Sequence, residues 1–523
     1  MIAMKNKKSC STLRPTDNNG KVVICLPDTG ESIDQKTPPL GTLSVAGYLE
    51  SNNIPILHID AVLHENCEQI IIDQISDGAI CLALGFGTGP AISQAIRISE
   101  MVKDKFPNFP IIWGGWHPSL LPQQTLQHSS VDIIITGQGE ITLYETVECL
   151  RNSDDLKKVF GIGYKIGENV IMTPPRPLVN LDEFPPMAYH LIDFKDYPGP
   201  PNRRSTPSDR FSNFRSSQGC PWRCAYCADP QVFNRRWMTL SIQNTVDELE
   251  NLVNSYGITY VDFVDDTFIV NINRTKEFSK ELIKRNLPLK WSGNVRTGRI
   301  AKLDDSDLDL MKKSGCDLIH PGVEASSQEM LDYIQKDEKH ENTMIAAEKL
   351  KKAGITGLYA FMVSFPDEPD DFIDAQFEMI RNMKKLDPNV ITPVNFYVPY
   401  PGNSLYERSK EKGFIPPANL EEWADFGTRI GTAVPWITQA YREKVMMLDK
   451  YLLPAAYPSR HLKWRMENTW WLGQLYKILS LIANFRVEKK WYKWSLDWKL
   501  IYSYWKFWEK WNRRIRLPNI FFR

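Results

Sequence analysis

The chain has 523 residues, too many for one hydrophobic core, which predicts about three structural units. Its 63 Lys or Arg balance 63 Asp or Glu, so the net charge gives no reason to expect nucleic-acid binding. Scattered cysteines, a polar start and the lack of a long apolar run predict a protein of the reducing cytoplasm, with membrane association through a surface contact as the alternative.

Residues 21–152, after a polar leader over residues 1–20, alternate between strand and helix patterns. Short apolar runs such as VVICLP (22–27) and ICLALGF (80–86) are typical of buried parallel strands. This alternation predicts an α/β fold that begins with a doubly wound, Rossmann-like domain. Glycines follow three successive strands: Gly85, Gly87, Gly89, Gly114, Gly115, Gly137 and Gly139. Each pair alone could serve a turn, but three sets at strand ends favour a large flat or phosphate-bearing ligand.

The next segment, residues 153–210, is rich in proline and polar residues and predicts a linker. A second alternating series over residues 211–410 contains six strand-and-helix units and predicts a partial (β/α)6 TIM-type barrel. Chemistry is then expected at the carboxyl ends of its strands. Residues 411–523 are expected to form a helical C-terminal region.

Three cysteines stand close together in GCPWRCAYC (219–227), at Cys220, Cys224 and Cys227. Three thiolates on one loop can hold three irons of a cubane and leave the fourth iron open for another ligand. A zinc site completed by a distant residue, or buried thiols without a metal, are the alternatives.

This spacing, with Tyr226 as the aromatic residue before the last cysteine, resembles the signature of the radical S-adenosylmethionine (SAM) superfamily. The resemblance implies a 4Fe-4S cluster whose open iron binds the amino and carboxylate groups of SAM. It also implies an electron donor such as flavodoxin or ferredoxin, whose electron cleaves SAM to methionine and a 5′-deoxyadenosyl radical.

The first domain resembles the cobalamin-binding domain found in one large class of these enzymes, on PPLGTLSVAGYL (38–49), IIWGGWHPS (111–119) and VDIIITGQGE (131–140). No D-x-H-x-x-G motif is present and PDTGESID (27–34) holds no histidine, so cobalamin is expected base-off without a histidine ligand. His117 is expected to shape its turn or touch the nucleotide tail. The cobalamin contacts implied are Leu40, Gly41, Gly87, Thr88, Gly114, Gly115, His117, Gly137, Gly139 and Glu140.

On the barrel, the resemblance assigns Tyr226, Arg296 and Glu324 to SAM. Asp265, Asp266 and Tyr397 are catalytic candidates that would line the substrate cavity. Surface ion pairs for the charged residues and core packing for the tyrosines are the alternatives. YPGNSLY (400–406) carries Asn403 where the family usually has threonine, which leaves the role of that position open.

The activity implied is that of a metal-binding methyltransferase that methylates an unactivated carbon of a small natural-product or lipid precursor. One alternative is an oxidative cyclase or ring-rearranging enzyme without net methyl transfer, and another is a cobalamin or iron-sulfur sensor. No nucleic-acid partner is expected.

The tail, residues 461–523, holds nine of the sixteen tryptophans and 14 Lys or Arg against 4 Asp or Glu. Its apolar residues recur every three or four positions and predict one stripe of a basic amphipathic helix. Such a helix either lies on a membrane surface or caps the barrel. The stripe comprises Trp491, Trp494, Trp498, Ile501, Trp505 and Trp508.

Overall fold

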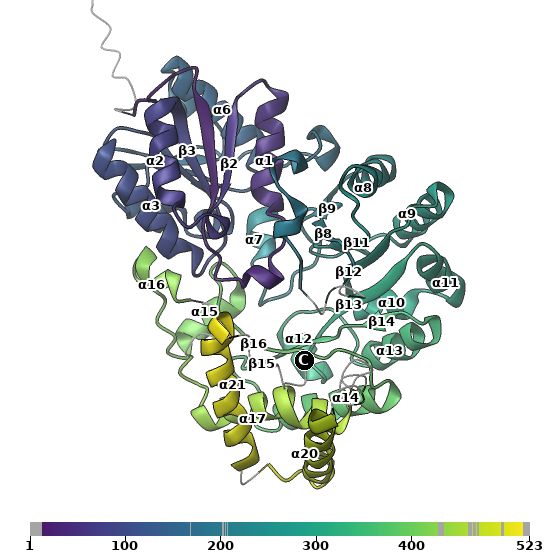
Figure 1. Cartoon of the computed structure of the whole chain (residues 1–523). Coiled ribbons are helices and arrows are strands. Elements are labelled where there is room, and N and C mark those ends of the chain that lie inside the picture. The colour runs from purple at the N-terminus through teal and green to yellow at the C-terminus, as the bar shows by residue number, and fades with distance from the viewer. Residues whose placement is uncertain are drawn as a thin grey trace, which may run out of the picture.

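The structure is a computed structural model, shown in Figure 1. It describes residues 13–515 apart from 168, 201–202, 204–205, 207, 427–433, 459–462, 464–466, 468–469 and 493–495. Most of the predicted leader and Trp494 lie outside the described residues, as do the side chains of 470–472, 505–506 and 508–515. In the described part, no helix has the length and apolarity that crossing a bilayer requires.

The first domain is built on a sheet in which five parallel strands run in the order β2-β1-β3-β4-β5, which is doubly wound as predicted. Its central strands are buried on both faces because helices cover the sheet on both sides (Figure 1). The strands are β1 (Lys21–Leu26), β2 (Ile56–Asp60), β3 (Ala79–Gly85), β4 (Ile111–Gly114) and β5 (Ile133–Ile135). The helices are α1 (Leu40–Ser51), α2 (Cys67–Gly78), α3 (Ala91–Lys105), α4 (Trp116–Leu120), α5 (Pro122–Gln127) and α6 (Glu140–Asn152).

Part of the predicted linker belongs to this sheet instead. Strands β6 (Ile162–Ile166) and β7 (Asn169–Met172) continue it beyond β5, both antiparallel to their neighbours. The prediction of a linker over 153–210 is therefore wrong for this hairpin. Its outer strand β7 is largely exposed, so its sequence lacks the continuous apolar run that marks the parallel strands.

The second domain is a curled sheet of parallel strands in the order β16-β15-β13-β12-β11-β8, open between its two edge strands, which confirms the partial barrel. The strands are β8 (Phe211–Phe214), β11 (Tyr260–Phe263), β12 (Lys290–Arg296), β13 (Cys316–Glu324), β15 (Ala360–Val363) and β16 (Val394–Phe396), with the short β14 (Thr356–Gly357) beside β13. The helices are α8 (Ile242–Tyr256), α9 (Ile272–Arg285), α10 (Thr297–Lys302), α11 (Asp305–Lys313), α12 (Gln328–Tyr333), α13 (Asn342–Ala353) and α14 (Phe372–Leu386).

Alternation along β12 decides which of its side chains face the inside of the barrel. Trp291 packs against Phe263 and Phe278, on the side covered by helix α9. Arg296, five residues later, points the opposite way and reaches the cysteine loop. The inner wall therefore presents the polar side chains of β12.

The C-terminal region is helical, and its first part bridges back to the first domain. Trp423 on α16 donates a hydrogen bond to Gln124 Oε1 at 2.7 Å. The helices are α15 (Ser404–Glu411), α16 (Leu420–Ala424), α17 (Gln439–Met447), a π-helical turn (Leu448–Leu452), α18 (Leu453–Ala456), α20 (Trp470–Glu488) and α21 (Leu496–Ile515).

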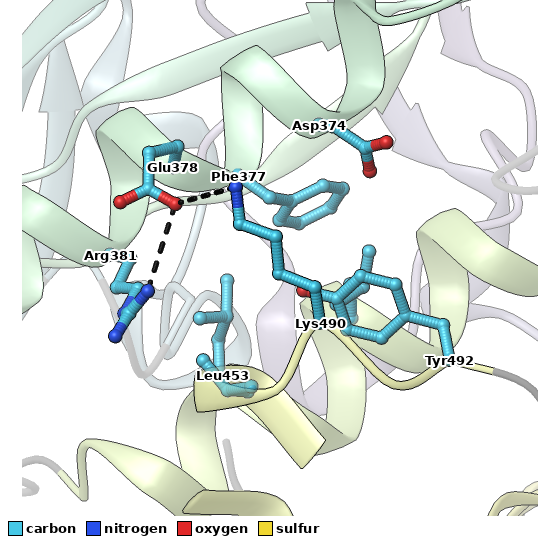
Figure 2. A pocket seen from close by; sticks show the side chains of 9 residues that line it. Asp374, Phe377, Glu378, Arg381, Leu453, Lys490 and Tyr492 are labelled. Carbon is cyan, nitrogen blue, oxygen red and sulfur yellow. Dashed lines mark ion pairs between the residues drawn. The ribbon is translucent and has the colours of Figure 1, made fainter.

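The last two helices are attached to the barrel by a seam against α14, shown in Figure 2. Lys490 and Arg381 both approach the Glu378 carboxylate, at 3.6 and 3.7 Å. Deeper in, Arg486 is fully buried and both oxygens of Asp497 accept from it at 2.6 Å, which ties α20 to α21. The tail is thus packed on the protein along this seam.

Candidate functional site

The three cysteines lie on the loop between β9 (Ser217–Gln218) and α7 (Asp229–Phe233), just beyond the carboxyl end of β8. All three are half-buried and free. Burial raises the pKa of Cys220 and of Cys227 to about 12, so both are neutral thiols until a cation favours the thiolate. The Asp229 N–H donates to Cys227 Sγ at 3.4 Å, a contact that supports a thiolate.

The metal-binding donor set of this loop consists of three thiols. Among the described residues, no three Cys, His, Asp or Glu side chains converge on one metal position. A cubane does not require such convergence, because each thiolate binds a different iron. The donor set, three thiols on one loop, therefore suits the expected cluster.

A second loop, residues 334–341 between α12 and α13, holds the cysteine loop from one side. The Ala225 N–H donates to Ile334 O at 2.9 Å, and Arg223 makes a two-fold contact with Asp337 at 3.0 Å. Glu338 accepts from Arg296 Nε at 3.0 Å. Sequence reasoning missed this loop, and its only signal is the cluster of charged residues of both signs in QKDEK (335–339).

Arg296 ends β12 and lies directly against the cysteine loop. In addition to its contact with Glu338, the Arg296 guanidinium donates to the Lys336 carbonyl and, at 3.5 Å, to Cys224 Sγ. It also stacks 4.6 Å from the Trp222 ring. These contacts fix the fork of Arg296 beside Cys224. The predicted contact with SAM at this residue stays a prediction.

Glu324 ends β13 with a φ of +63°, a left-handed conformation that is costly for a residue with a side chain and concentrates at functional sites. Its carboxylate forms a buried ion pair with Lys336 at 2.9 Å. Lys336 also donates to the Tyr226 hydroxyl at 3.3 Å. The structure thus brings Glu324 and Tyr226 together around a lysine that sequence reasoning had not identified, while their contacts with SAM stay predictions.

Asp265 and Asp266 both support the start of the cysteine loop. Asp265 is fully buried and accepts from Ser216 N, Ser216 Oγ and Ser217 Oγ at 2.5 to 2.7 Å. Asp266 accepts from Gly219 N at 2.8 Å. With its oxygens committed to these donors, Asp265 acts here as a positioning residue rather than as a wall of the substrate cavity.

Asp229, the first residue of α7, lies next to the cysteine loop. Burial and the neighbouring Asp266 carboxyl raise the pKa of Asp229 to about 8, so this side chain is mostly protonated at neutral pH.

Tyr397 is buried in the core, 5.5 Å from the Phe365 ring and with its hydroxyl 3.4 Å from Ser409 Oγ. The core alternative therefore describes Tyr397 better than a cavity position.

The glycine-lined edge of the first sheet fits a large ligand. A side chain added at Gly41, Gly87 or Gly137 would meet nothing within 4 Å, so these glycines face open space. Gly115 has a φ of +101°, and a Cβ there would lie 2.3 Å from the Phe86 carbonyl, which only glycine avoids. Beside them, Leu40 is buried, a Cβ at Gly114 would come no nearer than 3.9 Å to another atom, and a Cβ at Gly139 would meet Val45 at 3.3 Å, so Gly139 permits close packing.

His117 and Glu140 have partners within the protein. His117 is buried, its Nδ1 lies 3.2 Å from Thr88 Oγ1 and its ring meets Trp423 edge-on. Glu140 accepts from Ser44 Oγ at 2.6 Å and pairs with Arg215 at 3.4 Å. Arg215 follows β8 of the barrel, so Glu140 links the two domains; its contact with cobalamin stays a prediction.

A second polar contact joins the domains next to the cysteines. Gln138, in the GQGE motif of the first sheet, donates to Gln218 Oε1 at 3.0 Å. Gln218 lies two residues before Cys220. The glycine-lined sheet edge and the cysteine loop therefore meet at one interface, a relation that the two motifs alone could not reveal.

Two buried histidines make stability depend on pH. Burial lowers the pKa of His117 and of His320 to about 4, against about 6.5 in an unfolded chain. Between about pH 4 and pH 6.5, the two histidines bind protons only in the unfolded chain. Above about pH 6.5 they are neutral in both states and do not lower the free energy of unfolding. Below it, each histidine lowers that free energy by up to about 1.4 kcal/mol per pH unit, down to about pH 4.

Replacing His320 with glutamine should therefore flatten the loss of stability on acidification. The measurement is urea unfolding at about pH 7.5 and about pH 5. His340→Gln, at an exposed position, is the matched control and should leave the loss unchanged. An equal loss in His320→Gln and the unmodified chain would contradict the prediction.

Comparison with protein families divides the chain as the structure does. Residues 28–147 match the model of the B12 binding domain, and residues 214–379 match that of the radical SAM superfamily.

Curated relatives match most of the chain. An uncharacterized methyltransferase of Pyrococcus horikoshii is 28% identical over 77% of this chain and 86% of its own length. The anaerobic magnesium-protoporphyrin IX monomethyl ester cyclase of Synechocystis is 25% identical over 73% of this chain and 74% of its own length.

Two solved structures share the fold. TsrM from Kitasatospora setae, a radical SAM methyltransferase solved with cobalamin and a 4Fe-4S cluster, has a TM-score of 0.61 at 15% identity and covers 77% of this chain and 81% of its own. OxsB, a cobalamin-dependent SAM radical enzyme, has a TM-score of 0.61 at 20% identity over 75% of this chain and 55% of its own. The two matched models show that the chain combines a B12 binding domain with a domain of the radical SAM superfamily, and the two solved structures share this fold.

Proposed function

We propose that this enzyme methylates an unactivated carbon of a small natural-product or lipid precursor, with cobalamin as the methyl carrier. The observation that carries the proposal is the contact between Gln138 and Gln218, which joins the glycine-lined edge to the cysteine loop. A substrate held at this interface would lie between the two cofactors. The methyltransferases among the relatives support this reaction.

The residues of the chain would have distinct tasks in this reaction. Cys220, Cys224 and Cys227 would hold the cluster, which when bound supplies the one-electron chemistry of the family. Glu324 and Lys336 offer a carboxylate and an ammonium side by side, suited to the opposite charges of an amino acid group such as that of SAM. The pair is buried, so water is largely excluded from this position.

The electron donor is proposed to be an acidic protein such as flavodoxin or ferredoxin. Arg223, Arg235 and Arg236 are exposed on and just after the cysteine loop, close to the electron's destination. Opposite charge on a partner would guide it to this place. Charge reversal at Arg235 and Arg236 should slow reduction by flavodoxin while leaving reduction by dithionite unchanged.

A second candidate function is oxidative cyclisation or ring rearrangement without net methyl transfer. It is favoured by the cyclases among the relatives, of which three are 25 to 26% identical over 71 to 73% of this chain.

The ratio of products distinguishes the two functions. We expect one S-adenosylhomocysteine for each 5′-deoxyadenosine, because each methylation would consume one SAM as a radical source and one as a methyl source. The measurement is mass spectrometry after anaerobic reconstitution with SAM, cobalamin, a reductant and candidate lipid or natural-product precursors. 5′-Deoxyadenosine with a cyclised product and no S-adenosylhomocysteine would overturn the methylation proposal in favour of the alternative.

A further inference from the structure

Helix α20 is apolar on two opposite faces. One face packs into the protein through Tyr476, Ala483 and Val487, which are all buried. The other face carries Ile478, Leu481, Ile482 and Phe485, at the i, i+3, i+4 and i+7 spacing of one helical stripe, and all four are exposed. Leu481, for example, is 72% exposed. A helix that only capped the barrel would have polar residues on this outer face.

Helix α21 repeats the pattern. Trp498 is buried and stacks on Tyr502, so the tryptophan stripe predicted from the sequence turns toward the protein at this point. Leu496 and Leu500 lie on the opposite side of the helix and are 67% and 73% exposed. We call the set Ile478, Leu481, Ile482, Phe485, Leu496 and Leu500 the outer apolar face.

The outer apolar face is held in place by buried contacts. Arg486, on the packed side of α20, pairs with Asp497 at 2.6 Å, and Asp497 accepts from the Tyr451 hydroxyl at 3.0 Å. The seam of Figure 2 secures the same end of α20 to α14. The apolar stripes are therefore exposed even though both helices are packed on the protein.

Charge indicates what covers this face. Residues 461–523 contain 14 of the 63 Lys or Arg but only 4 of the 63 Asp or Glu, so the rest of the chain is net acidic. Lys477, Lys489 and Lys499 are exposed beside the apolar stripes. We propose that the outer apolar face is a peripheral binding surface for an anionic lipid bilayer.

Charge favours lipid over a second copy of this chain. A second copy would bring a second strongly basic tail against the first, and like charges would oppose the contact. Apolar side chains flanked by lysines on a helix surface are the composition of such interfacial helices.

The test is flotation of the full chain with vesicles of phosphatidylcholine alone or mixed equally with phosphatidylglycerol. We expect binding to the mixed vesicles, at least about tenfold weaker binding to phosphatidylcholine, and release by salt. The double substitution Leu481→Asp and Phe485→Asp should weaken binding to mixed vesicles by about tenfold or more. Replacing Lys477, Lys489 and Lys499 with glutamine should weaken only the part that depends on anionic lipid.

Ile415→Asp is the matched control, because Ile415 is 87% exposed and lies outside the tail. It should bind vesicles like the unmodified chain. Absence of binding to either vesicle would overturn the proposal, as would self-association that the Leu481 and Phe485 substitutions abolish while vesicles stay unbound. The assay needs no cofactor, so its result is independent of whether the proposed methyl transfer is correct.

Discussion

Replacing Cys224 with alanine is expected to abolish cluster assembly and all cleavage of SAM. Cys224 is one of three thiols on the loop and the one that Arg296 contacts, at 3.5 Å. Two remaining thiolates cannot hold three irons of a cubane. The measurements are iron and labile sulfide after anaerobic reconstitution, and 5′-deoxyadenosine formed from SAM, both of which should fall to background.

Cys149→Ala provides the control. Cys149 is also free and half-buried, but it lies on α6 of the first domain, away from the cysteine loop. This variant should assemble the cluster and cleave SAM like the unmodified enzyme. Full SAM cleavage by Cys224→Ala would refute the assignment of the cluster, and with it the proposed function.

Replacing Asp265 with alanine is expected to destabilise the barrel strongly. The change leaves the Ser216 N–H and the hydroxyls of Ser216 and Ser217 buried without their acceptor. It also removes the carboxylate that faces Arg274, which is itself half-buried. Breaking a buried charged network of this kind costs about 3 to 5 kcal/mol. We expect the apparent thermal midpoint to fall by about 6 °C or more.

Thermal unfolding followed by circular dichroism measures this effect. Asp371→Ala is the matched control, because Asp371 is exposed and its side chain makes no capping hydrogen bond to α14. Asp265→Asn should lie between the two, since an amide keeps the shape but accepts through one oxygen only. A midpoint for Asp265→Ala equal to that of Asp371→Ala would show that the loop does not depend on this carboxylate.

The sequence by itself determined the features that are local along the chain. Buried parallel strands need apolar side chains on both faces, so the central parallel strands of the first domain are visible as apolar runs. The cysteine motif is equally local, because all three thiols lie within one loop of the chain. The glycines at the strand ends could be found for the same reason, since bare backbone there requires glycine itself.

Only the tertiary structure decided the contacts between distant segments. The loop of residues 334–341 lies about a hundred positions beyond the cysteines, and no local pattern marks the ion pairs that bring it to them. Asp265 is an acid at a strand end in the sequence, and only its three donors show that it supports the loop.

The tail shows the same division between pattern and packing. Spacing predicted an amphipathic helix, but α20 and α21 each have apolar residues on two opposite faces. Spacing alone cannot tell which of the two faces is buried. That choice depends on the free energy of packing against the rest of the protein, which buries Trp498 and leaves Leu500 exposed.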